Sequence, residues 1–265
     1  MIKLDEKHRI QVNRNSSKGN QLKWKKEDIW YKADFLGYEA LSEYVISSLL
    51  EKTNVKDFVK YDIEHIDYMG HIYNGCSSKD FLGSDEVLVT LPRLFSLYLD
   101  EDIYMECERL DRTEADCIKY VVDNVIKITS LEKFGEHLTM MLELDAFFLN
   151  EDRHFHNIAV IYNEKTKQFR NCPIFDNGGS LFSDMSIAYL QEKSIEECRD
   201  IIRAKPFSPC FKDQVKAAQS LYGVQFQYWF TQKDIHRILE QASARKVYSS
   251  QIIERVENIL IEQVE

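Results

Sequence analysis

The hydrophobic pattern of this chain changes near residue 76, and that change limits the folds open to it. Before this point, short β-favouring runs alternate apolar and polar residues, as in Gln21–Trp24 and Ile29–Lys32, and one helical stripe covers Leu36–Leu50. After it, helical patterns dominate and are interrupted by one predicted β-hairpin, over residues 158–170. We therefore predict an α+β fold with a small β-rich part that carries one helix and a larger, mainly helical part.

The same periodicity predicts the individual elements. Besides the runs named above, we expect strands at 9–12, 55–66 and 71–73 in the first part. In the second part we expect helices at 87–99, 113–128, 131–149, 187–204, 213–222, 233–244 and 247–264. A β-rich part followed by a helical part is the arrangement that a nucleotide cleft between two lobes requires.

Size and charge exclude several classes of protein. With 265 residues, of which 44% are hydrophobic, the chain can bury the core of one large domain or of two coupled lobes. A net charge of −10 disfavours non-specific binding to nucleic acid or to an anionic membrane. The charged N-terminus is unlike a signal peptide, no apolar run approaches a membrane span, and the six cysteines are scattered like reduced thiols. We expect a cytoplasmic protein without a transmembrane segment.

The run Leu149–Val160 carries the strongest chemical signal. It places Asp152 and Asn157 between an apolar helical pattern and a strand pattern, and a further acid, Asp176, follows the predicted hairpin. Phosphoryl transfer needs these groups in this order: one carboxylate accepts the proton of the attacking hydroxyl, and an Asn and a later Asp hold the Mg²⁺ that screens ATP. The pattern thus predicts a phosphoryl-transfer loop.

Simpler roles compete with this interpretation. Asn157 can be a loop-capping amide, and Asp176 can form a turn into the glycines at 178 and 179. A zinc site built from Asp152, His154 and His156 is a further alternative, although no other His or Cys lies at a ligand-like spacing.

The residues also resemble a known family. The run Asn150–Asn157 reads N-E-D-R-H-F-H-N, is followed by an apolar strand and then by Asp176, and in this resembles the C-terminal core of HipA-like serine/threonine kinases. The segment Asp152–Asn157 is also similar to the catalytic loop of phosphoinositide 3/4-kinases, which share the wider kinase fold. The resemblance implies a single bilobal kinase domain over 1–265, with an N-lobe at 1–76 and a C-lobe at 77–265 that carries the catalytic hairpin.

The resemblance also implies a lysine–glutamate pair for the ATP phosphates. Lys32 ends the third predicted strand, and Glu39 and Glu43 share one face of the next helix. We prefer Glu43 as the partner, because it leads into the apolar stripe of that helix. The alternative is that Lys32 protects an edge strand and that both glutamates are solvated.

HipA-like kinases carry an unusual phosphate loop before this lysine, with small residues and a trailing lysine. Ser16, Ser17, Gly19 and Lys23 are compatible with such a loop, although a plain hairpin loop fits the residues equally well. In some relatives a serine here is autophosphorylated. We therefore expect phosphate on Ser16 or Ser17, where its added negative charge weakens ATP binding.

The resemblance leaves the acceptor open. The order of elements favours a protein serine or threonine, whereas the Asp152–His154 triplet is also found with a lipid or small-molecule acceptor. The glycine-poor phosphate loop favours a third possibility, a pseudokinase that binds nucleotide without transfer. Full-length HipA-like toxins carry an additional N-terminal subdomain, so we expect a compact kinase here. The toxin–antitoxin role and the DNA-bound complex of those relatives do not carry over, and the sequence gives no direct indication of nucleic-acid binding.

Overall fold

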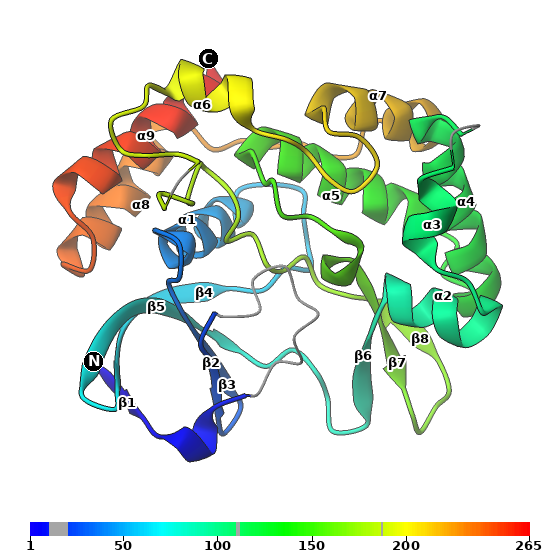
Figure 1. Ribbon diagram of the computed structural model, residues 1–265, viewed down its shortest axis with the longest axis horizontal. Helices are drawn as coiled ribbons and strands as arrows, with labels where there is room; N and C mark the ends of the chain where they lie inside the picture. The colour runs from blue at the N-terminus through cyan, green and yellow to red at the C-terminus, as the bar shows by residue number, and fades with distance from the viewer. Residues whose placement is uncertain (11–20, 110–111, 187) are drawn as a thin grey trace. The chain divides into compact units, whose positions relative to one another are not determined.

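The computed structural model describes residues 1–10, 21–109, 112–186 and 188–265 (Figure 1). By their contacts these residues form two compact units. The first unit contains Met1–Asp80, Asp176–Ile202 and Gln227–Glu265, and the second contains Phe81–Phe175 and Arg203–Phe226. The sequence-based division ran at residue 76, whereas here two C-terminal segments group with the N-terminal sheet. A single kinase domain over 1–265 stays a prediction.

The first unit is built on a five-stranded sheet with the strand order β1-β4-β5-β3-β2. β1 pairs with β4 in parallel, and the other neighbours are antiparallel. The buried side chains of Trp24, Ile66 and Tyr68 belong to one apolar cluster against this sheet. The bounds of its strands are Ile2–Leu4 (β1), Lys23–Lys26 (β2), Ile29–Ala33 (β3), Tyr61–Tyr68 (β4) and His71–Lys79 (β5).

The strand predicted at 9–12 differs from the structure. Arg9 forms only an isolated bridge with Trp24, residues 11 and 12 lie outside the described ranges, and the first strand is β1, followed by the 3₁₀ helix η1 (Glu6–His8). The first strand is short, and alternation over three residues is too brief a pattern to identify it from sequence.

Helix α1 (Glu39–Leu50) is almost fully buried, because it contacts β4 and β5 and also packs against α8 (Gln232–Ala244). The Lys52 ammonium lies 2.5 Å from the Asp234 carboxylate at the start of α8, and α9 (Ser250–Val264) packs against α8. The helix predicted at 187–204 is shorter in the structure. It begins at Ile195 (α6, Ile195–Ile201), because Ser194 and Glu197 form a capping box there.

The second unit combines a three-stranded antiparallel sheet, in the order β6-β7-β8, with helices. Helix α5 packs against α4 and α7, and Gly135 of α5 allows the ring of Tyr222 to approach closely, since a Cβ there would lie 2.5 Å from that ring. The elements are β6 (Glu86–Thr90), α2 (Leu91–Leu99), α3 (Ile103–Cys107), α4 (Glu114–Thr129), α5 (Phe134–Phe148), η2 (Phe155–Asn157), β7 (Ala159–Asn163), β8 (Phe169–Asn171) and α7 (Phe211–Tyr222).

One predicted helix, at 87–99, was wrong in its first four residues. Residues Glu86–Thr90 form strand β6, which pairs with β7 and places Val89 opposite Val160. Thr90 then stands at the N-cap of α2 and Pro92 lies in its first turn, where the missing N–H of proline is harmless. The β-branched side chains of Val87, Val89 and Thr90 are better suited to a sheet than to a helix.

The cysteines form no disulfide, because all six carry free thiols. Among the described residues, no helix combines the length and the hydrophobicity that a membrane span requires.

Candidate active site

Lys32 is held by two carboxylates within the first unit. It lies on β3, and its Nζ is 3.0 Å from Oε1 of Glu43 on α1 and 2.8 Å from Oδ1 of Asp176. The Glu43 side chain is 2% exposed, and the ring centroid of Tyr61 lies 5.3 Å from the Lys32 ammonium. We call Lys32, Glu43 and Asp176 the lysine cluster. The structure thus brings together three residues that the sequence placed far apart.

Electrostatics fix the charge states in this cluster. Burial alone lowers the pKa of Lys32, but the attractions of Asp176 and Glu43 outweigh it and hold that pKa well above its usual value. Burial raises the pKa of Glu43, and the Lys32 ammonium opposes this effect. The raised pKa favours the protonated, cationic form of Lys32.

Glu43 is the partner of Lys32, whereas Glu39 binds backbone N–H groups before its own helix. Oε2 of Glu43 accepts a hydrogen bond of 2.9 Å from the backbone N–H of Asn177, so one carboxylate orients both the lysine and the segment after Asp176. Glu39 instead accepts backbone N–H groups at its own helix start, including that of Leu36 at 2.8 Å. The preference for Glu43 over Glu39 agrees with this geometry.

Asp176 has a left-handed backbone, with φ of 59°. Among residues with a side chain, Asp adopts this conformation at comparatively low cost. The Asp176 backbone N–H donates to the Tyr61 hydroxyl at 3.4 Å, and the ensuing Gly178 lies against Glu39, where a Cβ would be 3.3 Å from the Glu39 Cβ. Local turn geometry and the proposed metal role therefore coexist at Asp176, and neither excludes the other.

Lys23 is a second cation on this side of the sheet. It lies opposite Lys32 in the β2–β3 ladder, so both side chains point to the same face. Its pKa is lowered, mainly by burial and with a contribution from Lys32. Among the described residues, its ammonium has no ion pair or hydrogen-bond partner. The sequence indicated Lys23 only through its position after the phosphate loop.

In the second unit, Arg153 organises the loop that carries Asp152. Its side chain is fully buried, and Nε lies 2.9 Å from Oδ2 of Asp145 at the end of α5. A second guanidinium nitrogen, Nη1, donates to the Phe175 carbonyl at 2.8 Å, and Phe175 directly precedes Asp176 in the chain. The acid that pairs with the buried Arg153 guanidinium is thus Asp145.

Asp145 was not among the predicted site residues. Burial raises its pKa, and Arg153 opposes that shift. Asn150 links the pair to the loop, because its Nδ2 donates to Asp145 at 2.8 Å and its Oδ1 accepts the Asp152 N–H at 3.1 Å. One sequence signal was available: an acid on the otherwise apolar stripe of a predicted helix needs a buried partner.

Asp152 and Asn157 meet within this loop. Nδ2 of Asn157 donates to the Asp152 carbonyl at 2.9 Å, so this hydrogen bond does not use the amide oxygen, which is the predicted metal ligand. Oδ1 of Asp152 lies 3.5 Å from Nζ of Lys205, a residue far along the chain, and 3.9 Å from Nε2 of His154. Sequence reasoning did not find Lys205, since nothing in its local sequence marks it.

The other predicted phosphate-binding residues, Ser16, Ser17 and Gly19, lie outside the described residues. Their contact with phosphate stays a prediction.

The two predicted metal ligands are oxygen donors. The Asp176 carboxylate in the first unit and the Asn157 amide oxygen in the second are each a hard oxygen donor of the kind that Mg²⁺ prefers. Within the described ranges, no group of three or more His, Cys, Asp or Glu side chains is placed to hold a metal ion by itself.

Comparison with solved structures shows the fold. No family model and no curated protein matches the sequence. The structure is similar to CtkA, a proinflammatory kinase of Helicobacter pylori, with a TM-score of 0.61 and 19% identity, over 99% of this chain and 94% of that one. This likeness defines a kinase-like α+β fold and confirms the fold that the sequence predicted.

A further match is HipA of Shewanella oneidensis, solved with HipB and operator DNA as a toxin–antitoxin complex. It has a TM-score of 0.48 and 11% identity, over 96% of this chain and 62% of that one.

Proposed function

We propose that this protein transfers the γ-phosphoryl group of ATP, with Mg²⁺, to the hydroxyl of a protein serine or threonine. The observation that carries the proposal is the lysine cluster. A buried ammonium fixed by a helix glutamate and a following aspartate is what a kinase uses on the α- and β-phosphates. The kinase-like fold supports the same conclusion.

The remaining roles follow from chemistry at named atoms. Lys32 and Lys23 offer positive charge to phosphate oxygens, and Asp176 and Asn157 would hold Mg²⁺, which neutralises the charge that develops on those oxygens. Asp152 orients the acceptor hydroxyl and takes its proton. In the transfer, the acceptor oxygen bonds to the γ-phosphorus, the bond from that phosphorus to the β–γ bridging oxygen breaks, and ADP leaves.

The lipid or small-molecule acceptor and the pseudokinase remain as alternatives that one experiment separates. Purified wild type and the variants Asp152→Asn and Asp152→Ala are incubated with labelled ATP and cell lysate, and thermal shifts with ATP and Mg²⁺ are recorded in parallel. We expect ATP to stabilise all three proteins, by about 2.7 kcal/mol at a hundredfold excess over Kd. We expect transfer to fall by roughly 10²–10⁴-fold in both variants.

The matched control is Asp123→Ala, which removes an exposed acid of the same unit that pairs only with a surface lysine. It should retain both nucleotide stabilisation and transfer. If wild type binds ATP but labels neither itself nor any acceptor, the protein is a nucleotide-binding pseudokinase. Label in lipid or in a small metabolite identifies the other acceptor class.

Autophosphorylation is a finer part of the proposal. Mass spectrometry after incubation with ATP should find phosphate on Ser16 or Ser17, and the phosphorylated fraction should show a weaker ATP-dependent thermal shift, because the added charge repels the nucleotide phosphates. Ser48→Ala, on α1, serves as the control. Protein that labels itself while both loop serines stay unmodified would contradict this assignment.

A further inference from the structure

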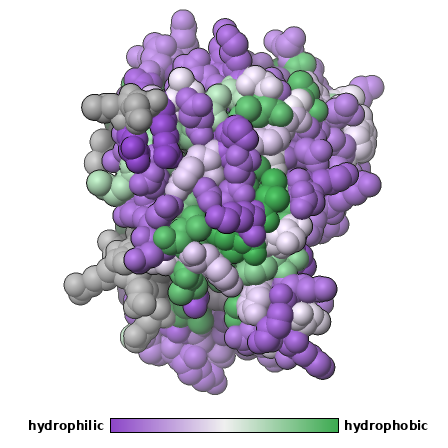
Figure 2. All heavy atoms as spheres, turned by 90° about the vertical axis from the view of Figure 1, so that its right-hand side faces the viewer, coloured by the Kyte–Doolittle hydropathy of each residue, from purple (hydrophilic) through white to green (hydrophobic). Residues whose placement is uncertain are grey.

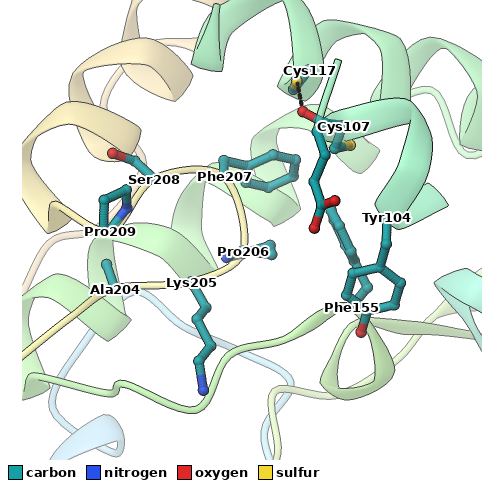
Figure 3. Close-up of a pocket in the computed structure, with 11 residues that line it drawn as sticks. Tyr104, Cys107, Cys117, Phe155, Ala204, Lys205, Pro206, Phe207, Ser208 and Pro209 are labelled. Atoms are coloured by element: carbon teal, nitrogen blue, oxygen red, sulfur yellow. Dashed lines mark hydrogen bonds between the residues drawn. The ribbon is translucent and has the colours of Figure 1, made fainter. Parts of the chain in front are cut away.

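A pocket of about 240 Å³ opens in the second unit (Figure 3). Three aromatic rings form part of its wall: the Tyr104 and Phe155 rings meet edge to face with centroids 5.1 Å apart, and the Phe155 and Phe207 rings do the same at 5.4 Å. The other apolar lining residues are Cys107, Cys117, Ala204, Pro206 and Pro209. Such a lining favours an apolar ligand group, because burying that group removes its surface from water.

Two residues of this pocket connect it to Asp152. Phe155 lies three positions after Asp152, on the same loop. Lys205 also lines the pocket, and its Nζ lies 3.5 Å from Oδ1 of Asp152. In Figure 3 the Lys205 side chain points away from the 204–209 segment and towards the backbone segment that leads to Phe155. The pocket is therefore connected to the proposed proton-accepting carboxylate of Asp152 through the Lys205 side chain and through the loop that carries Phe155.

We propose that this pocket binds one large apolar side chain of a polypeptide acceptor, close in sequence to the serine or threonine that is phosphorylated. The inference rests on the proposed function and adds to it the acceptor class and a sequence preference. The volume supports a single side chain: pockets for whole drug-sized ligands span roughly 300–1,000 Å³, which is more than is available here.

Charge favours a peptide over a membrane lipid. Glu108, the C-cap of α3, lines the pocket, and Asp102 is the N-cap of the same helix, whereas Glu106 pairs with Arg112 at 3.1 Å. Figure 2 shows the face on which α2 to α4 lie, where apolar side chains gather between charged ones. Acidic side chains repel anionic lipid headgroups, whereas they attract a peptide that carries Lys or Arg.

The test is a positional-scanning library of synthetic serine and threonine peptides, phosphorylated with labelled ATP by the full-length protein. Wild type should select Leu, Ile, Met or Phe at one fixed position relative to the acceptor. Cys107→Phe fills the pocket and should raise the KM of the best peptide about ten-fold or more, because a hydrophobic pocket discriminates by roughly 10–200-fold for such changes in size. Phe207→Ala enlarges the pocket and should shift the preference towards Trp.

The matched control is Met105→Phe. It makes the same kind of change on the same helix, at a side chain that is 66% exposed and does not line the pocket. This variant should keep the wild-type preference. The thermal shift with ATP and Mg²⁺ is measured for every variant, so that loss of folding or of nucleotide binding is recognised separately.

The outcomes separate the two proposals. Transfer to peptides without any positional preference, or equal effects of Cys107→Phe and Met105→Phe, would overturn the pocket assignment and leave phosphoryl transfer intact. Label in phosphatidylinositol vesicles in place of peptides would also overturn it, in favour of a lipid acceptor. Failure of wild type to transfer label at all would overturn the proposed function, and the pocket assignment with it.

Discussion

At the scale of single residues, the balance of charges decides the protonation states of the side chains in the candidate site. The Lys32 ammonium faces one carboxylate that is almost fully buried and one that is a quarter exposed, with relative side-chain exposures of 2% for Glu43 and 26% for Asp176. Removing the cation leaves two carboxylates facing each other without compensation, which favours proton uptake by one of them. Nucleotide phosphates would then meet repulsion in place of attraction.

Lys32→Met is expected to abolish the thermal shift with ATP and Mg²⁺ and to lower kcat by roughly 10²–10³-fold, the usual effect of losing one preorganised charge at a reacting group. Labelled-ATP transfer and thermal unfolding measure the two effects. Lys26→Met, on an exposed residue of β2, is the control and should behave like wild type. Full transfer by Lys32→Met would remove Lys32 from the site.

His137 predicts a pH dependence of stability. Burial lowers the pKa of His137 to about 4, and its Nε2 is buried without a partner among the described residues. His137 takes up a proton near pH 6.5 in the unfolded chain but only near pH 4 in the folded chain. Its contribution to the free energy of unfolding is therefore fully present above pH 6.5 and is lost as the pH falls towards 4. This contribution should amount to about 2 kcal/mol between pH 7 and pH 5.

Urea unfolding at pH 7 and pH 5 measures the effect. In His137→Gln, which has a polar side chain that does not titrate, the loss of stability between the two pH values should be smaller than in wild type by that amount. His71→Gln, at an exposed position of β5, controls for general histidine effects. An unchanged pH dependence in His137→Gln would show that His137 titrates alike in both states.

At the scale of elements, the junction between α5 and β7 is built around a buried ion pair. The Arg153 guanidinium links Asp145 at the end of α5, the Asn157 carbonyl before β7 and the Phe175 carbonyl. Such a pair adds little net stability over an apolar core, yet losing one partner leaves an uncompensated buried charge. Its role is to fix the conformation of the loop that carries Asp152.

Arg153→Met is expected to destabilise the protein by about 3–5 kcal/mol, measured by chemical unfolding, because Asp145 then stays buried without its cation. Asp145→Asn combined with Arg153→Met removes that charge while an acceptor for Asn150 remains, so the double variant should be more stable than Arg153→Met alone. If the double variant is less stable than both single variants, the pair acts through more than its charge.

At the scale of the whole molecule, each compact unit is assembled from separate parts of the chain. The first unit needs the segments at 176–202 and 227–265 as well as its N-terminal sheet. Helix α1 packs against α8, Trp229 N–H donates to the Lys52 carbonyl at 3.1 Å, and the Tyr248 hydroxyl donates to Asp34 at 2.7 Å. Without these segments, much of the apolar surface of α1 would be in water.

The fragment of residues 1–80 is therefore expected not to fold alone. Circular dichroism should show no cooperative thermal transition, and limited proteolysis should degrade it much faster than the full chain. Adding residues 227–265 to the fragment through a flexible linker should restore part of the protection. A cooperative transition in the fragment of residues 1–80 by itself would show that α8 and α9 are not required.

The candidate site was predictable to the extent that local patterns carry it. Lys32 could be placed at the end of a strand, Glu43 on the next helix, and Asp152, Asn157 and Asp176 around a hairpin, because strand and helix periods fix which side chains share a face. The role of Asp145 could not be predicted in this way. Its position on the apolar face of a predicted helix indicates that it is buried, but does not identify the cation that pairs with it. Lys205 carries no local signal, and only folding brings its ammonium to Asp152.

The sequence by itself determined the change from a β-rich part to a helical part, most of the elements, and the order of Lys32, Glu43, Asp152, Asn157 and Asp176. These follow from residue periodicity and spacing, which are local. Tertiary structure alone decided that β6 breaks a predicted helix, that C-terminal helices complete the first unit, and that a pocket lined by three aromatic rings and Lys205 opens in the second unit. Each of these depends on contacts between residues far apart in the chain, whose energies come from mutual packing and desolvation.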